Sequence, residues 1–186
     1  TREPDGFAAS HLPDSINIWL DGLSLYPGWT LEYDQNILLV TERKEDVETA
    51  EAYLQRLGFD NIIGYLCVGI KGWRNQGKTT DSLGTLSVDS LKKKMDENEI
   101  VLVDVRDPVE WKEGHIEGAE NIYVGHLRDK AEQLPNNKPV ATTCGWGGRG
   151  GLGASILKKI GMDEVYNVLG GVKAWKSKGY PLKMED

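Results

Sequence analysis

Short apolar runs punctuate the second half of the chain. Residues 100–103 (Ile-Val-Leu-Val) form one that ends at Asp104, residues 139–143 (Pro-Val-Ala-Thr-Thr) form another that leads directly into Cys144, and residues 165–169 form a third. Apolar runs of this length are typical of strands that are buried on both faces in a parallel sheet. We therefore predict three buried strands in this region.

Two helices are predicted from the segments between and after these strands. Residues 150–160 carry apolar side chains at helical spacing, at positions 152, 156, 157 and 160, and Gly161 can end this helix. Residues 172–178 predict a second, short helix with Trp175 on its inner face. Strands that alternate with helices at this spacing indicate an α/β fold with a mainly parallel sheet.

The sequence also repeats itself with a period close to 104 residues. Arg2-Glu3-Pro4 aligns with Arg106-Asp107-Pro108, His11 with His115, and Asn17-Ile18 with Asn121-Ile122. Further matches follow in the same order at shifts of 103 (Leu54 with Leu157, Gly58 with Gly161) and 102 (Gly69 with Gly171, Trp73 with Trp175). We interpret this as a tandem duplication. It predicts a first domain over residues 1–79, a polar linker over residues 80–84 and a second domain over residues 85–186.

The first copy lacks the opening of the second, because the counterpart of Asp104 would be residue 0. An interior strand is then missing, and the gap leaves backbone N–H and C=O groups unpaired. We expect the chain to be part of a longer protein, with this strand supplied by residues upstream of Thr1 or by another molecule. Otherwise the region from Arg2 to Ile18 should be rearranged.

Composition narrows the possible functions. The 186 residues include 22 Lys and Arg against 29 Asp and Glu, a formal net charge of −7 that argues against nucleic-acid binding. The longest nearly apolar stretch, residues 62–70, is too short to span a bilayer, so no membrane partner is expected. Two cysteines, Cys67 and Cys144, favour a cytoplasmic location over a secreted disulfide scaffold. Scattered histidines and cysteines show no metal-ligand spacing.

The candidate chemistry lies in the glycine-rich segment 143–151 (Thr-Cys-Gly-Trp-Gly-Gly-Arg-Gly-Gly), between a predicted strand and a predicted helix. Glycines let the backbone curl so that successive N–H groups form an anion-binding nest, to which the helix adds the positive end of its dipole. A cysteine sulfur in such a nest is stabilised as the thiolate. We therefore predict that Cys144 is a nucleophile and that Arg149 closes over a group attached to its sulfur. The alternative is a buried structural cysteine in a turn.

Three motifs give the second copy its resemblance to the rhodanese family of sulfurtransferases. They are residues 102–106 with Glu110 and residues 114–122, the loop from Cys144 to Arg149, and residues 169–172 (Leu-Gly-Gly-Val) with Trp175. The resemblance covers residues 85–181 and implies a parallel sheet of about five strands flanked by helices. It implies transfer of sulfane sulfur, from a persulfide or thiosulfate donor to a thiol or cyanide acceptor, through a persulfide on Cys144. No cofactor is implied in this chain.

The same resemblance assigns roles to individual residues. It places catalysis on Cys144 and Arg149, substrate binding on Gly145, Trp146, Gly147 and Gly148, and supporting roles on Asp104 and Arg106. We interpret Asp104 and Arg106 as a buried pair that ties the loop scaffold together, Trp146 as a partly exposed rim, His115 as a structural hydrogen-bonding residue and His126 as a solvated loop residue.

The loop departs from two related patterns. Position 145 is Gly where many thiosulfate-using relatives carry a basic residue, so a low-molecular-weight persulfide is as plausible a donor as thiosulfate. Related phosphatase-type domains place the arginine six residues after the cysteine, whereas Arg149 is five residues after Cys144. The shorter, sulfur-sized loop argues against a phosphatase or arsenate reductase.

The first copy has no nucleophile at the equivalent place. Thr41 or Glu42 aligns with Cys144, and the residues around them are acidic and lack glycine. The first copy therefore resembles an inactive rhodanese domain, and Cys67 is predicted to be a buried free thiol. A non-catalytic tandem that docks a partner is the alternative for the whole chain. Residues 2–7, 11–13 and 42–50 resemble the rhodanese region of fusions with a metallo-β-lactamase-fold persulfide dioxygenase, which is the expected upstream partner.

Overall fold

The computed structural model describes residues 1–135 and 137–185. These form two compact units, Thr1–Ser82 and Leu83–Asp186, and the boundary between them along the chain falls within the segment 80–84 predicted to be the linker. Over the described residues, none of the helices combines the length and the apolar character that crossing a membrane requires.

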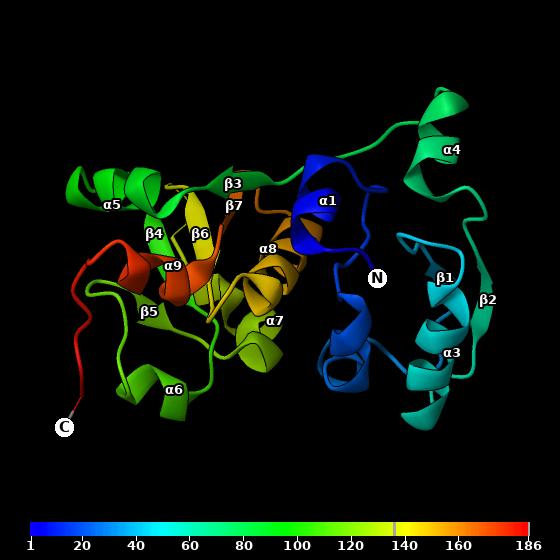
Figure 1. Cartoon of the computed structure of the whole chain (residues 1–186), viewed down its shortest axis with the longest axis horizontal. Helices are drawn as coiled ribbons and strands as arrows, with labels where there is room; N and C mark the ends of the chain where they lie inside the picture. Colours follow the sequence, from blue (N-terminus) through cyan, green and yellow to red (C-terminus); the bar gives the residue numbers. More distant parts are fainter. Residues whose placement is uncertain (136, 186) are drawn as a thin grey trace. The chain divides into compact units, whose positions relative to one another are not determined.

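The second unit is built on a five-stranded parallel sheet (Figure 1). Its strands are β3 (Gly84–Leu86), β4 (Val101–Asp104), β5 (Glu120–Asn121), β6 (Val140–Thr143) and β7 (Val165–Val168). Their order across the sheet is β3-β7-β6-β4-β5, so β6 lies at the centre. The predicted apolar runs thus form the three interior strands, and Cys144 follows the central one.

Helices cover both faces of this sheet. They are α5 (Val88–Asp96), α6 (Pro108–Lys112), α7 (Leu127–Lys130), α8 (Gly148–Lys159) and α9 (Gly171–Ser177), with short 3-10 turns at Val124–His126 and Ala131–Gln133. On one face, side chains of α5 and α9, among them Leu91 and Trp175, form a buried cluster with Leu102 and Ala141 of the sheet. On the other face, α8 approaches so closely that Gly153 lies against Leu127 of α7 and Thr142 of β6.

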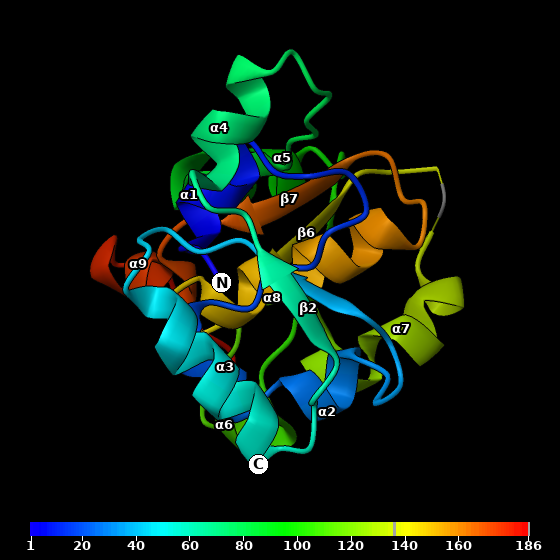
Figure 2. The same cartoon turned by 90° about the vertical axis from the view of Figure 1, so that its right-hand side faces the viewer.

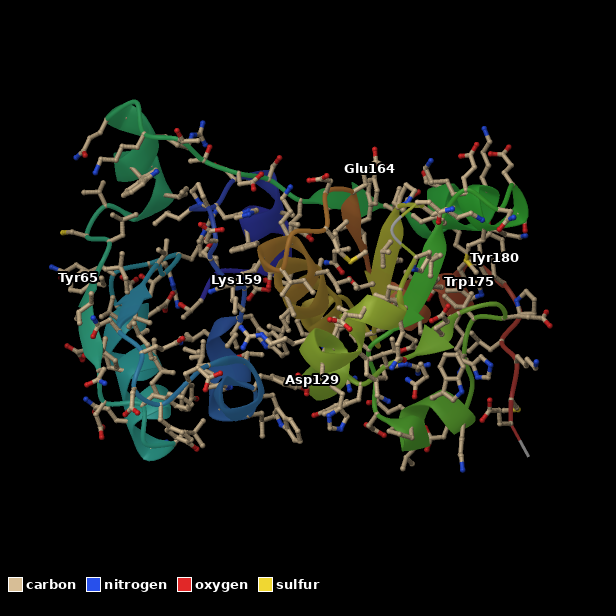
Figure 3. All side chains as sticks on the ribbon, turned by 180° about the vertical axis from the view of Figure 1, so that it is seen from behind. Tyr65, Asp129, Lys159, Glu164, Trp175 and Tyr180 are labelled. Carbon is tan, nitrogen blue, oxygen red and sulfur yellow. The ribbon has the colours of Figure 1, made fainter. Side chains whose placement is uncertain are left out.

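Two residues that follow α9, Lys178 and Tyr180, form hydrogen bonds with α5. The rings of Trp175 and Tyr180 pack 4.9 Å apart, and both are labelled in Figure 3. The Tyr180 hydroxyl donates to Asp89 of α5 at 2.6 Å, and Lys178 pairs with the same carboxylate at 2.7 Å. These hydrogen bonds, with the Lys178 charge, hold the pKa of Asp89 below its ordinary value.

The first unit repeats only part of this architecture (Figure 2). It contains α1 (Pro4–Ala9), a 3-10 turn (Leu20–Ser24), α2 (Pro27–Thr30), β1 (Ile37–Leu39), α3 (Asp46–Arg56), β2 (Ile62–Tyr65) and α4 (Gly69–Asn75). The parallel strands β1 and β2 correspond to β6 and β7 at a shift of 103. The described residues of this unit form these two strands, as expected for a first copy that lacks the opening of the second. In the repeat register the counterparts of β3 and β4 would precede Thr1, and the counterpart of β5 then has no β4 to pair with.

The shared contacts extend the duplication to individual hydrogen bonds. His115 bonds to the Trp111 carbonyl and stacks on its ring at 3.6 Å, and His11 does the same with Phe7 at 4.0 Å. Asn121 donates to the Arg106 carbonyl at 2.9 Å, as its repeat partner Asn17 does to Arg2 at 2.8 Å. The region from Arg2 to Ile18 thus keeps the arrangement of the second copy and is not rearranged.

One sheet face of the first unit stays open. Leu38 and Ile63 are 49% and 66% exposed, whereas the equivalent positions of the second unit, Ala141 and Tyr166, belong to or pack against the cluster under α5 and α9. In the second unit α5 covers this face of the sheet. The described residues of the first unit contain no counterpart of α5, so Leu38 and Ile63 stay exposed.

Leu102→Ala tests the importance of the cluster beneath α5 and α9. Leu102 is 1% exposed on the interior strand β4, so we expect the substitution to lower the free energy of unfolding of the second unit by about 2–5 kcal/mol. Urea unfolding, followed by tryptophan fluorescence, measures the loss. Val109→Ala removes a side chain that is 69% exposed and should change stability by less than about 0.5 kcal/mol. Equal effects of the two changes would contradict this account of the core.

Candidate active site

Cys144 lies at the point where β6 ends and the glycine-rich loop begins. Its side chain is fully buried, and its Sγ accepts a hydrogen bond of 3.1 Å from the backbone N–H of Gly147. Gly147 has a φ of +120°, a backbone conformation that other residues rarely adopt. An N–H group that donates to the sulfur stabilises the thiolate more than the neutral thiol.

The start of α9 holds this loop in place. Backbone N–H groups of Val172 and Lys173 donate to the carbonyls of Cys144 and Gly145, at 2.8 and 2.9 Å. Because these carbonyls are bound from the α9 side, the loop is held in the curled shape that presents the Gly147 N–H to the sulfur. Gly171 makes the approach possible, since a Cβ at this position would lie 2.1 Å from the Cys144 carbonyl oxygen.

Two polar side chains of the sheet hold the loop from the other side. Asn167 of β7 donates to the Gly147 carbonyl at 3.3 Å, and Thr142 of β6 donates to the Gly150 carbonyl at 2.7 Å. A Cβ on Gly150 would lie 2.5 Å from the Asn167 Oδ1. Neither Asn167 nor Thr142 is among the residues predicted for the site from the sequence. The available signal was a polar residue, Asn167, within an otherwise apolar strand.

Arg149 is bound to a carboxylate. Its two terminal nitrogens donate to both oxygens of Glu110 on α6, one of them at 2.7 Å. The side chains of Arg149 and Glu110 are 16% and 35% exposed, and Asp107 lies 3.9 Å from the same guanidinium. The structure thus engages Arg149 with α6, while its predicted closure over a group on the sulfur stays a prediction.

Asp107 adds a second negative charge at this place. Its carboxylate caps α6 by accepting from the N–H groups of Val109 and Glu110. These backbone hydrogen bonds and the nearby Arg149 charge favour the negatively charged form of Asp107.

The remaining loop positions lie as follows. Trp146 is 48% exposed, and its ring lies over Gly148, where a Cβ would come within 2.4 Å of it. Gly145 is placed beside Arg149, whose Nη2 would be 3.8 Å from a Cβ there. Of the four predicted substrate-binding residues, Gly147 contacts the Cys144 sulfur and Trp146 is exposed, while substrate binding by the four stays a prediction.

Asp104 and Arg106 form a buried ion pair beneath the loop. Arg106 donates to both oxygens of Asp104, at 2.6 Å from its Nη2 and 2.9 Å from its Nε, and also to the Gly114 carbonyl. Val105, between them, donates its N–H to the carbonyl of Thr143, the residue before Cys144. The pair thus stabilises the end of β4 next to the nucleophile. His115 is buried and His126 is exposed.

The equivalent place in the first unit holds a network of ion pairs. Glu42 accepts from Arg2 at 3.1 Å, and Arg43 pairs with Asp46 at 2.6 Å. Cys67 lies elsewhere, and the prediction that it is a buried thiol is wrong, because it is exposed in the turn that follows β2. Its repeat partner Leu169 is also 36% exposed, so this position belongs to the turn and not to the core.

The two matches of the rhodanese-like domain family cover residues 1–76 and 87–178. The chain therefore belongs to the rhodanese-like domain family, as a tandem of two such domains.

Individual relatives agree with this membership. Over 77 residues, 41% of this chain and 61% of the relative, it is 42% identical to the uncharacterized protein YqhL of Bacillus subtilis. Over 109 residues, 58% of this chain and 59% of the relative, it is 30% identical to the putative sulfur carrier protein YrkF of the same species. The chain thus spans about three fifths of the length of these curated relatives.

A solved structure agrees with the tandem fold. The thiosulfate sulfurtransferase of Pseudomonas aeruginosa matches all of this chain with 39% of its own length, at a TM-score of 0.50 and 21% identity. At this identity the likeness concerns the fold alone.

Gly171→Ala tests the contact between α9 and the loop. The new Cβ would overlap the Cys144 carbonyl, so α9 has to move, and we expect the free energy of unfolding to fall by more than about 3 kcal/mol. Gly179→Ala is the matched control. Its φ of +76° is also positive, but nothing lies within 4 Å of its added Cβ, so only about 1 kcal/mol of backbone strain is expected. Similar losses in urea unfolding of the two variants would show that the contact carries no special weight.

Proposed function

We propose that the second unit is a sulfurtransferase that carries sulfane sulfur on Cys144. The observation that carries the proposal is the hydrogen bond from the Gly147 N–H to the Cys144 sulfur, in a loop whose carbonyls are held by α9. A thiolate stabilised by fixed backbone donors is both a good nucleophile and a suitable carrier for a second, negatively charged sulfur.

The reaction has two displacement steps. In the first, the Cys144 thiolate attacks the outer sulfur of a donor, a new S–S bond forms, and the bond to the rest of the donor breaks. Thiosulfate releases sulfite, and a persulfide releases its parent thiolate. In the second step, cyanide or a thiolate attacks the outer sulfur of the Cys144 persulfide, so that thiocyanate or a new persulfide leaves and the Cys144 thiolate returns. No electrons are gained or lost overall, so the proposed reaction uses no cofactor.

The comparisons and the loop length favour this chemistry over its alternatives. The relative YrkF is described as a putative sulfur carrier protein, a role that needs the same reversible attachment of sulfur. The spacing from Cys144 to Arg149 matches the shorter loop of sulfur-transferring relatives and not the longer phosphatase loop. Because Cys144 is buried, neighbouring side chains have to move before a donor can reach it.

The proposal also includes the larger setting. We infer that the first unit, which has ion pairs where Cys144 would be, serves packing or partner contact, and that the tandem works in the cytoplasm beside a metallo-β-lactamase-fold persulfide dioxygenase in the same protein. Resemblance in residues 2–7, 11–13 and 42–50 supports this setting. The coding sequence upstream of Thr1 tests it, since a zinc-binding metallo-β-lactamase domain has to be encoded there.

Sulfur transfer is tested with cyanide as the acceptor and either thiosulfate or glutathione persulfide as the donor. We expect thiocyanate to form, and the donor alone to add about 32 Da, one sulfur atom, to Cys144. Cys144→Ala should lower the rate by at least about 100-fold because it removes the nucleophile that carries the sulfur.

Cys67→Ala is the matched control, because it removes an exposed thiol from the first unit and should leave the rate unchanged. Equal activity of Cys144→Ala and the wild type would instead favour the non-catalytic docking module. Absence of both turnover and the added sulfur would reject the proposed function.

A further inference from the structure

The one arginine of the nucleophile's loop is already occupied. Both terminal nitrogens of Arg149 donate to the Glu110 carboxylate, which comes from a different element, α6. A bidentate carboxylate uses the edge of a guanidinium that could otherwise receive an oxyanion. An anionic donor that is to bind this edge of Arg149 therefore has to displace Glu110.

The charges around Arg149 favour weakly charged donors. The Arg149 guanidinium faces the carboxylates of Glu110 and Asp107, at 2.7 Å and 3.9 Å. Arg149 and Glu110 are partly shielded from water, so these charges are screened less than on an open surface. A dianion that approaches this group meets repulsion that a singly charged or neutral group meets only in part.

We propose that Glu110 determines the choice of sulfur donor, by holding Arg149 so that donors with a dianionic reacting group, such as thiosulfate, are disfavoured relative to persulfides, whose reacting group carries one negative charge. This inference rests on the proposed function. The distinction follows the leaving groups, because thiosulfate leaves as sulfite with a charge of up to −2, whereas a persulfide leaves as a thiolate with one negative charge at the reacting end. Glu110 thus acts as a specificity-determining residue through Arg149.

Glu110→Gln tests the proposal, because glutamine keeps the size of the side chain and removes its charge. With cyanide as acceptor, we expect kcat/KM for thiosulfate to rise about 5-fold, mainly through a lower KM, as expected for the loss of one partly exposed charge partner. For glutathione persulfide the change should be less than about 2-fold. The ratio of the two values is the readout, since a merely structural role of Glu110 would move both donors alike.

Glu113→Gln is the matched control. Glu113 is an exposed carboxylate at the end of the same helix, so its loss changes the net charge equally and should leave the donor ratio unchanged. In an Arg149→Ala background, Glu110→Gln should have no effect on the ratio. A fall for both donors in Glu110→Gln, an equal rise for both, or the same shift in Glu113→Gln would overturn the proposal.

A binding measurement separates this proposal from the proposed function. Calorimetric titration of thiosulfate into Cys144→Ala needs no turnover, and adding Glu110→Gln should tighten binding about 5-fold. If the wild type transfers no sulfur but this gain is seen, the sulfurtransferase function fails and the role of Glu110 in anion binding stands. If transfer is seen with neither the gain nor the shift in donor ratio, the inference about Glu110 fails alone.

Discussion

The site depends on two hydrogen bonds that do not involve the nucleophile's side chain. Val172 and Lys173 bind the carbonyls of Cys144 and Gly145, and this contact requires Gly171. The carbonyls of a curled, buried loop need hydrogen-bond donors, because each one left without a donor would cost about 1–3 kcal/mol. Because α9 satisfies them, the Gly147 N–H is available to the sulfur. The third sequence motif is therefore part of the site although none of its side chains performs chemistry.

The first unit keeps the approach of a helix to the loop but has no cysteine at the position of Cys144. Gly69 aligns with Gly171, and its Cβ position faces the carbonyl of Thr41, the counterpart of Cys144, at 3.6 Å. The approach of the helix to the loop is thus retained in a looser form. The supports of the loop itself have changed, since Gly64 stands where the second unit has Asn167. Retention of the frame without the loop supports indicates that the frame contributes to stability independently of any reaction at the loop.

Local patterns predicted the three interior strands and the helices α8 and α9 of the second unit, and pointed to Cys144, because each of these is encoded within a few neighbouring residues. The apolar runs before Asp104 and Cys144 became adjacent interior strands. The position of Cys67 was wrong because a repeat alignment places a residue in an equivalent turn without saying how exposed that turn is. The pairing of Arg149 with Glu110 was missed for a different reason. It joins residues from two elements far apart in the chain, and only the order of strands in the sheet brings α6 to the loop.

Two positively polarised groups of this loop, the Gly147 N–H and the Arg149 guanidinium, differ in how easily they change. The backbone N–H of Gly147 is fixed by hydrogen bonds on both sides of the loop, so its effect on the sulfur is the same for every donor. The Arg149 guanidinium is a side chain whose partner, Glu110, is 35% exposed, so its availability depends on a contact that a single substitution removes. On the proposed function, the stabilisation of Cys144 by the backbone and the choice of donor by the Arg149–Glu110 ion pair can therefore change independently.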